Sequence, residues 1–234
     1  MKREEVKKFI EEYESTANFL EALIKNNASM QKKFPALKIS SRVKTVDSVL
    51  KKLLRKELTI SELNKLTDIA GVRIVVRFYE DIARVCEMIC ASGITIIEER
   101  DYINQIKKKS GYRAYHFIVE QEGRLAEIQI RTFAMDIWAN AEHNIRYKPT
   151  LHVTSKIEER LTSAVEYAHA LDEVTSFLYK EALKLAEDDG TMEILKALDG
   201  NRIHAELREQ LTLLLLEMRL TMFDIEREFE NEYT

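Results

Sequence analysis

Two acidic residues lie on or beside segments that read as β-strands. Asp68 comes immediately before Ile69-Ala70-Gly71, and Glu127 lies within RLAEIQIRT, residues 124–132. A lone acid at the entrance of a strand is most often a turn or cap residue. Two carboxylates from different strands could instead hold Mg²⁺, which binds one or two protein carboxylates together with substrate phosphates. The pair is therefore a candidate metal site for phosphate chemistry.

Cations recur at helical spacing in a helix that we expect from about residue 42 to residue 56. They and one hydroxyl are Lys44, Ser48 and Lys52 at i, i+4 and i+8, with Arg55 close by and Arg42 at the helix start. A cationic stripe beside an apolar seam is as often a solvated surface. The functional alternative is a polyphosphate site, because lysine and arginine donors match phosphate oxygens.

A third cationic patch, Lys107 to Lys109, leads into Ser110-Gly111-Tyr112-Arg113. It is either a charged loop tip before a strand or a group of phosphate contacts next to an aromatic stacking surface. The six glycines stand at 71, 93, 111, 123, 190 and 200, so the sequence contains neither a P-loop nor a Gly-x-Gly-x-x-Gly fingerprint. Any phosphate site must therefore use side chains.

Polar residues also mark the expected strand 124–132 and the helix after it. In the strand, Ile128 and Ile130 point to one face, whereas Glu127, Gln129 and Arg131 point to the other. The helix near 134–147 carries polar and aromatic residues together: Asp136, Trp138, Glu142, His143 and Tyr147. So varied a cluster exceeds what solubility requires.

The elements that must position these residues follow from the hydrophobic periodicity. Helical spacing predicts helices over 2–27 and 42–56, separated by a loop over 30–41, and further helices near 134–147, 154–187 and 202–230. β-branched runs predict strands over 72–79, 93–102, 114–120 and 124–132, with a helix bearing Cys86 and Cys90 on its apolar stripe after the first. We therefore expect an α/β (α+β) chain, with a mixed sheet flanked by helices and an all-helical C-terminal extension.

Composition narrows the class of protein. The 234 residues carry a net charge of −4, which does not mark a nucleic-acid binder. Six Gly and two Pro argue against a turn-rich β-sandwich, and two Cys argue against a disulfide scaffold and suit a reducing cytoplasm. The densest apolar run, Leu211 to Leu216, is far shorter than the roughly 20 residues of a membrane span. We expect a cytoplasmic protein without membrane association.

Four blocks of sequence together resemble one family. SRVKTVDSVLKKLLRK, DIAGVRIVVRF, RDYI…KKKSGYRAYH and EIQIRTFAMDIWANAEHNIRYK occur in the order found in the (p)ppGpp synthetase domain of RelA/SpoT proteins. The chain is most similar to the stand-alone small alarmone synthetases of the RelQ/RelP type. The resemblance implies a nucleotidyltransferase-like fold and transfer of a pyrophosphoryl group from ATP to the 3′-hydroxyl of GDP or GTP, with release of AMP.

The resemblance also implies roles for individual residues. Asp68 and Glu127 would ligate Mg²⁺, and Glu127 would also be the base for the 3′-hydroxyl. ATP would be bound by Arg42, Lys44, Ser48, Lys52, Arg55, Arg73, Glu142 and His143, with Arg42 and Arg73 stacking on the adenine. GDP or GTP would be bound by Lys108, Tyr112, His116, Gln129, Arg131 and Asp136, with Tyr112 stacking on the guanine.

Alternatives and assembly complete the expectations. We expect a synthetase domain over residues 1–150 and a helical extension over 151–234, whose a/d-like seam from Leu207 to Phe229 serves packing or oligomerisation. The resemblance favours a homotetramer. Two other functions stay open: a toxin-type relative that pyrophosphorylates tRNA 3′ ends or adenosine nucleotides, and a non-catalytic alarmone-binding regulator. RNA binding is possible but is not supported by the net charge.

Overall fold

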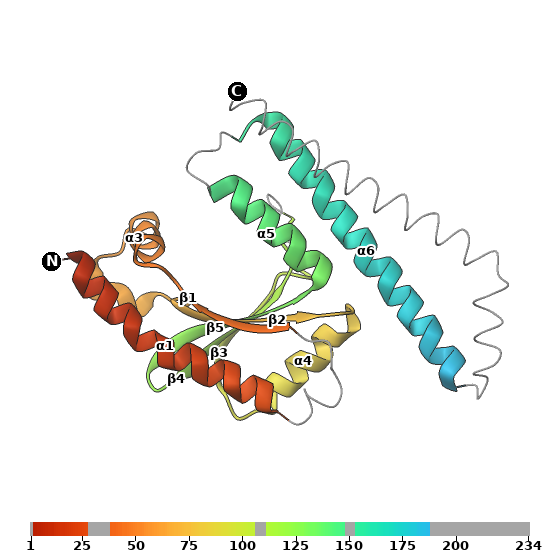
Figure 1. The fold of residues 1–234 in the computed structure, drawn as a ribbon, viewed down its shortest axis with the longest axis horizontal. Coiled ribbons are helices and arrows are strands. Elements are labelled where there is room, and N and C mark those ends of the chain that lie inside the picture. The colour runs from red at the N-terminus through yellow and green to blue at the C-terminus, as the bar shows by residue number, and fades with distance from the viewer. Residues whose placement is uncertain (1, 28–37, 106–110, 148–152, 188–234) are drawn as a thin grey trace. The chain divides into compact units, whose positions relative to one another are not determined.

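One mixed sheet organises the part of the chain that carries most of the candidate residues. The computed structural model describes residues 2–27, 38–105, 111–147 and 153–187 (Figure 1). Within these ranges the sheet has the order β1-β2-β5-β4-β3, in which β2 and β5 are parallel and the other neighbours are antiparallel. The strands are β1 (Lys38–Val43), β2 (Ala70–Val76), β3 (Thr95–Asp101), β4 (Tyr115–Gln121) and β5 (Arg124–Thr132). The expected mixed sheet flanked by helices is confirmed.

Helices account for most of the remaining described chain. They are α1 (Lys2–Asn26), α3 (Val46–Arg55), the 3-10 helix η1 (Ile60–Lys65), α4 (Glu80–Cys90), α5 (Phe133–Tyr147) and α6 (Ser155–Glu187). The helix expected over 202–230, with its a/d-like seam, lies outside the described residues. None of the described helices is long and apolar enough to traverse a lipid bilayer.

Packing divides the described chain into two compact units. The first, the sheet unit, comprises α1 to β3 and then Arg113 to Phe133. The second, the helical unit, comprises the described residues from Ala134 onward together with Gly111 and Tyr112. The division into residues 1–150 and 151–234 stays a prediction.

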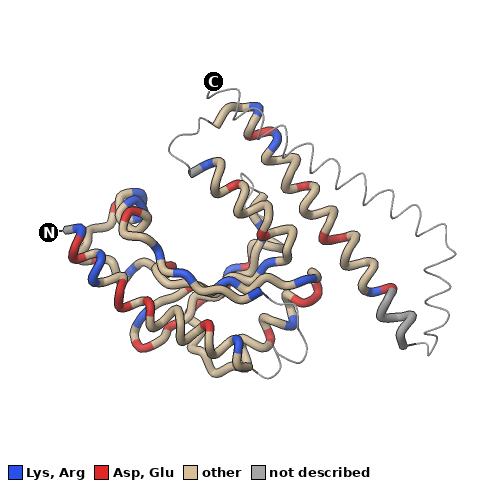
Figure 2. Tube along the Cα trace, in the orientation of Figure 1, with Lys and Arg blue, Asp and Glu red and all other residues tan. Residues whose placement is uncertain are grey.

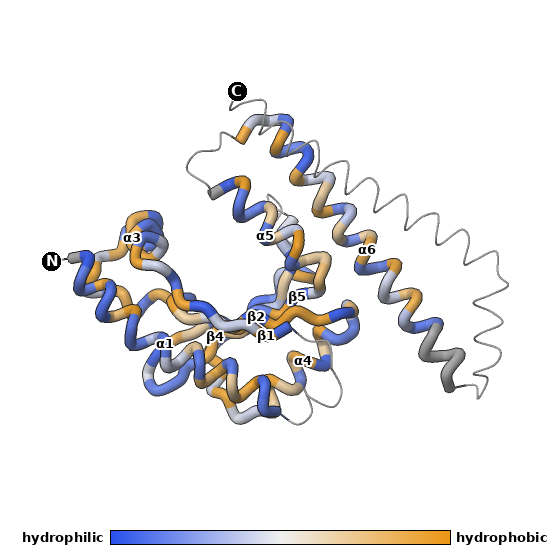
Figure 3. Tube along the Cα trace, in the orientation of Figure 1, coloured by the Kyte–Doolittle hydropathy of each residue, from blue (hydrophilic) through white to orange (hydrophobic). Residues whose placement is uncertain are grey.

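The two faces of the sheet differ in character. Side chains such as Ile74, Phe117, Ile128 and Ile130 are fully buried on one face, where α1 and α4 pack (Figure 1). Figure 3 shows α1 alternating hydrophilic and hydrophobic residues along its length, as a helix with one buried face requires. Because successive side chains of a strand alternate, every second residue is left for the opposite face, and these residues are mostly polar.

The turn between β4 and β5 fixes the register of the central hairpin. Glu122 and Gly123 both have positive φ, 51° and 74°, which matches the right-handed twist of adjacent strands. Residues Tyr115 to Gln121 then pair in register with Ile130 to Arg124. His116 is thereby placed opposite Gln129.

The expected helix over 42–56 begins later than its pattern indicated. Residues 38–43 form the edge strand β1, because they gain main-chain hydrogen bonds to β2 and place alternate side chains toward α1. The Thr45 side chain accepts a hydrogen bond from the Ser48 amide and so caps α3, which starts at Val46. Arg42 and Lys44 therefore precede the helix, and the described end of the expected 30–41 loop is strand.

The cysteine prediction was half right. Cys86 is half-buried on α4, and burial raises the pKa of its thiol to about 12, so it is inert at neutral pH. Cys90 is exposed, because the buried stripe of α4 runs through Ile82, Val85 and Ile89.

Candidate functional site

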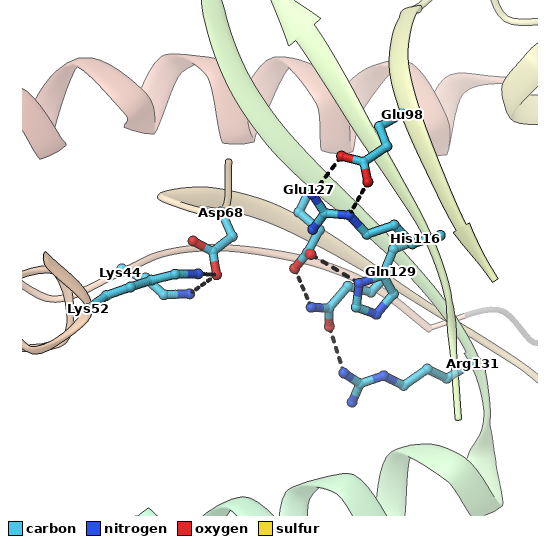
Figure 4. Close-up of polar contacts among 9 residues, drawn as sticks. Lys44, Lys52, Asp68, Glu98, His116, Glu127, Gln129 and Arg131 are labelled. Atoms are coloured by element: carbon cyan, nitrogen blue, oxygen red, sulfur yellow. Dashed lines mark hydrogen bonds and ion pairs between the residues drawn. The ribbon is translucent and has the colours of Figure 1, made fainter. Parts of the chain in front are cut away.

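Asp68 lies at the centre of a cationic cluster in the sheet unit. Its Oδ2 accepts a hydrogen bond from Lys44 Nζ at 2.9 Å and another from Lys52 Nζ (Figure 4). The three side chains are only 14–19% exposed. Lys52 comes from the second turn of α3, whereas Lys44 comes from the connection between β1 and α3. The expected helical stripe is therefore not one helix face, yet folding brings its two lysines to one carboxylate.

Charge, rather than exposure, keeps Asp68 ionised. Burial opposes ionisation, but Lys44 and Lys52 outweigh it and lower the pKa of Asp68 to about 2. Burial also lowers the pKa of Lys44, and Asp68 only partly offsets this. Because Asp68 is shared by two ammonium groups, the cluster carries a net positive charge. Such a cluster suits a polyanionic ligand.

Glu127 lies in a chain of hydrogen bonds on the polar face of the sheet (Figure 4). Arg131 donates to Gln129 Oε1 at 2.8 Å, and Gln129 Nε2 donates to Glu127 Oε2 at 2.6 Å. His116 Nδ1 lies 3.0 Å from the other oxygen, Glu127 Oε1, and its ring packs edge-on against Tyr102. This confirms the sequence-based placement of Glu127, Gln129 and Arg131 on one face of β5.

These contacts hold Glu127 as an anion. Burial opposes its ionisation, but the hydrogen bonds from His116 and Gln129 outweigh burial and keep the pKa of Glu127 below its usual range. Because an ionised carboxylate can only accept, His116 Nδ1 must carry the hydrogen of their shared bond. Glu127 can therefore accept a proton from a ligand hydroxyl, although its low pKa makes it a weak base.

The two carboxylates share one region of the sheet unit. Asp68 precedes β2 by two residues, and Gly71 of β2 pairs with Glu127 of the parallel strand β5. The Asp68 charge raises the pKa of Glu127, but this influence is smaller than those of burial, His116 and Gln129. Figure 4 shows both carboxyl groups on the same side of the strands. Folding thus joins the two acids that lie 59 positions apart in the sequence.

The surroundings of Asp68 fit a divalent cation. Its Oδ1 is buried and has no hydrogen-bond partner among the described residues. A carboxylate oxygen is the hard ligand that Mg²⁺ prefers. No group of three or more metal-ligating side chains is found in the described ranges. A site with two protein carboxylates is compatible with a cation that binds substrate phosphates as well.

The remaining donor candidates of the sheet unit lie around this region. Arg42 is paired with Gly71 across β1 and β2, and Arg73 is paired with Gln129 across β2 and β5, so both share the polar face with Glu127. Ser48 and Arg55 are exposed on α3. Figure 2 shows Lys and Arg residues gathered on α3.

Other candidates belong to the helical unit or lie outside the description. Tyr112 packs on a cluster formed by α5 and α6, and Asp136 accepts a hydrogen bond from Asn140 at 3.0 Å. Glu142 forms an ion pair with Arg146 at 3.0 Å, and the neighbouring His143 is exposed on α5. Lys108 lies outside the described residues. The structure therefore joins the Asp68 and Glu127 groups in one unit and carries Tyr112, Asp136, Glu142 and His143 on the other.

Sequence reasoning missed Arg100 and Glu98 of β3. Arg100 donates to both oxygens of Glu98, at 2.8 and 2.6 Å, and pairs with His116 across β3 and β4. The hydrogen bonds to Glu98 raise the pKa of Arg100, and the Glu127 charge raises it further. The alternation of β3 was a usable signal, because it places residues 98 and 100 on one face.

Comparisons with known proteins show which family the chain belongs to. Residues 41–152 match the family model described as a region found in RelA / SpoT proteins. The GTP pyrophosphokinases YjbM and YwaC of Bacillus subtilis are each 42% identical to the chain, over 147 and 153 residues. These alignments cover 59% and 60% of this chain and 69% and 72% of the relatives.

Solved structures of small alarmone synthetases are also similar to this chain. The crystal structure of small alarmone synthetase 1 from Bacillus subtilis has a TM-score of 0.69 and 35% identity, and the match covers 76% of this chain and 97% of that one. The structure of that protein bound to its product pppGpp has a TM-score of 0.68, again at 35% identity, with 75% and 96% covered. The chain therefore belongs to the RelA/SpoT family, among its small alarmone synthetases.

Proposed function

We propose that the chain is a (p)ppGpp synthetase. The 3′-oxygen of GDP or GTP attacks the β-phosphorus of ATP, and the bond between that phosphorus and the α-β bridging oxygen breaks. The pyrophosphoryl group moves to the ribose, AMP leaves, and the hydroxyl proton is accepted by the protein or water. The observation that carries the proposal is that the sheet unit holds two ionised carboxylates. They are Asp68, which accepts hydrogen bonds from two lysines, and Glu127.

The donor triphosphate would bind at the Asp68 cluster. Lys44 and Lys52 share one carboxylate, so a triphosphate could take over their ammonium groups. Asp68 Oδ2 would then be released to act beside the unpartnered Oδ1. Ser48 and Arg55 on α3 would add further phosphate contacts. Arg42 and Arg73 would stack on the adenine, since guanidinium groups pack well on aromatic faces.

The acceptor would bind along the Glu127 chain. Glu127, held by His116 and Gln129, would orient the 3′-hydroxyl and accept its proton. Arg131 and Lys108 would face the acceptor phosphates. From the resemblance, Tyr112 would stack on the guanine, Asp136 would contact the base, and Glu142 and His143 would bind ATP.

Asp68 and Glu127 would hold Mg²⁺ together with the substrate phosphates. The cation would neutralise charge on the transferred group and the leaving phosphate. Two polyanionic nucleotides repel one another, so lysines and arginines must bring them together in line. A positioned base accounts for about 10²–10⁴ in rate, and a base as weak as Glu127 falls at the low end. Charge neutralisation and alignment should therefore supply most of the acceleration.

An acceptor comparison tests the proposal. The purified chain is incubated with Mg²⁺ and ATP labelled in the γ position, with GDP, GTP, ADP or uncharged tRNA in parallel. We expect label in a guanosine product and equimolar AMP. Label on tRNA or on an adenosine nucleotide would support a toxin-type relative, and absence of AMP with every acceptor would support a non-catalytic regulator. Either result would overturn the proposal.

The proposal also covers the oligomeric state of the protein and its location in the cell. A homotetramer in the cytoplasm is expected from the resemblance and from the apolar seam between Leu207 and Phe229. Light scattering on the purified protein would measure the mass. A monomeric mass of 27.3 kDa would contradict the tetramer.

A further inference from the structure

Gly111, immediately before Tyr112, packs tightly against α6. A Cβ added at Gly111 would lie 2.6 Å from Val165 Cγ1 and 2.9 Å from Val165 Cγ2. Gly111 also has φ +66°, in the left-handed region that side chains rarely adopt. Two independent features, the close approach and the backbone angle, therefore require glycine at this position.

Tyr112 shares this contact with α6. Its ring packs, with Ala164 and Leu171, against a buried cluster. The members of that cluster are Ala134, Trp138, Ala139, Val165 and Ala168. Trp138 Nε1 donates to the Leu161 carbonyl of α6 at 3.1 Å and so joins α5 to α6. Tyr112 thus packs on a buried cluster of α5 and α6 residues that includes Val165.

We propose that Val165 is a positioning residue for the acceptor nucleotide. The inference rests on the proposed role of Tyr112 in stacking on guanine. By packing against Gly111, Val165 fixes the backbone that carries the Tyr112 ring, so that less conformational freedom is lost when the base binds. Val165 lies beyond residues 41–152, which match the family model, so α6 controls acceptor affinity from outside the matched region.

A positioning role of Val165 predicts that its truncation affects the KM for GDP more than the KM for ATP. Val165→Ala leaves a gap beneath Gly111 and releases the backbone before Tyr112. Ordering one such segment on binding costs roughly a threefold to tenfold factor in affinity. The KM for GDP should therefore rise by that factor, whereas the KM for ATP should change less, because only Glu142 and His143 of the ATP contacts proposed above lie in the helical unit.

A double variant at Gly111 and Val165 distinguishes a positioning role of Val165 from general destabilisation of the protein. Gly111→Ala should raise the KM for GDP tenfold or more, because the new methyl group meets Val165. Adding Val165→Ala removes both γ-methyl groups and should recover part of that loss. The isosteric Val165→Thr should keep a KM near the parental value. Ile157→Ala, which truncates a buried α6 residue of a different cluster, should lower the melting temperature without changing the KM for GDP.

The experiment measures steady-state AMP release by the full chain with GDP and ATP varied in turn, and GDP binding by calorimetry. A raised KM for GDP in Val165→Ala, with partial recovery in the double variant, supports the proposal. Equal KM and Kd for GDP in the parental chain and both single variants would overturn it. If the parental chain releases no AMP, the proposed function fails, and the calorimetric comparison still decides the role of Val165.

Discussion

Glu127→Gln is the most informative change at the site, because it removes one charge and keeps the shape of the side chain. Arg131 can only donate, so Gln129 must turn Oε1 toward Arg131 and Nε2 toward Glu127. The new amide can accept from Gln129 only if its own NH₂ group faces His116. His116 must then accept at Nδ1, which moves its hydrogen to Nε2.

The expected effect on stability is small. Both hydrogen bonds of residue 127 persist after this tautomer switch, but neither is charge-assisted any longer. Hydrogen bonds to charged groups contribute about 1.5–3 kcal/mol and neutral ones about 0.5–1.5 kcal/mol. The free energy of unfolding should thus fall by about 1–3 kcal/mol, a decrease of roughly 2–12 °C in melting temperature for a chain of this size.

The expected effect on catalysis is large. Losing a base as weak as Glu127 costs about 10² in rate, the low end of the range for general bases, or about 2.7 kcal/mol of transition-state stabilisation. Losing an anionic ligand of the cation adds to this. AMP release by Glu127→Gln should therefore fall at least about a thousandfold, while ¹⁵N NMR reports the Nε2–H tautomer of His116.

The matched control is Glu99→Gln, the same carboxylate-to-amide change on the opposite face of the same sheet. Glu99 accepts a hydrogen bond from Tyr115, away from the proposed site. This variant should keep parental turnover. A Glu127→Gln protein with turnover within tenfold of the parental value and an unchanged His116 tautomer would refute both the proton-accepting role and the hydrogen-bond argument.

Three further changes test other parts of the account. Asp68→Asn leaves Lys44 and Lys52 without their shared anion and removes the proposed cation ligand. We expect the Mg²⁺ concentration for half-maximal AMP release to rise at least tenfold, and an unchanged value would exclude Asp68 as a ligand. Tyr112→Ala removes a stacking surface that contributes about 1–3 kcal/mol, so the KM for GDP should rise by about 5–150-fold at constant KM for ATP, and an equal rise in both would contradict the stacking role. Hydrogen bonds from Lys65 and Thr59 lower the pKa of Glu62 to about 2, so the contribution of Glu62 to stability is present above about pH 4.5 and is lost as the pH falls toward 2. Glu62→Gln should therefore flatten the dependence of melting temperature on pH over that range. An unchanged slope would show that the cap of η1 does not contribute to stability.

The sequence was most informative where one local rule applied alone. A β-branched run predicted the strand 124–132, which matches the bounds of β5, and the two-residue period of a strand placed Glu127, Gln129 and Arg131 on one face, as the structure confirms. These features depend on neighbours in the sequence.

Prediction failed where tertiary contacts competed with a local pattern. Lys44, Ser48 and Lys52 have helical spacing, yet pairing of residues 38–43 with β2 extends the strand and delays the helix to Val46. The pairing of Arg100 with His116 depends on the register of β3 against β4, which the sequence does not encode locally. The contact of Gly111 with Val165 joins residues 54 positions apart.

Binding of Mn²⁺ in the presence of a non-hydrolysable ATP analogue tests the central claim most directly. Electron paramagnetic resonance would count the ions bound per chain in the parental protein, Asp68→Asn, Glu127→Gln and the control Glu99→Gln. We predict that the parental chain and the control bind the ion equally, and that each of the other variants loses it or binds it at least tenfold more weakly. Equal binding in all four proteins would contradict a cation held between Asp68 and Glu127.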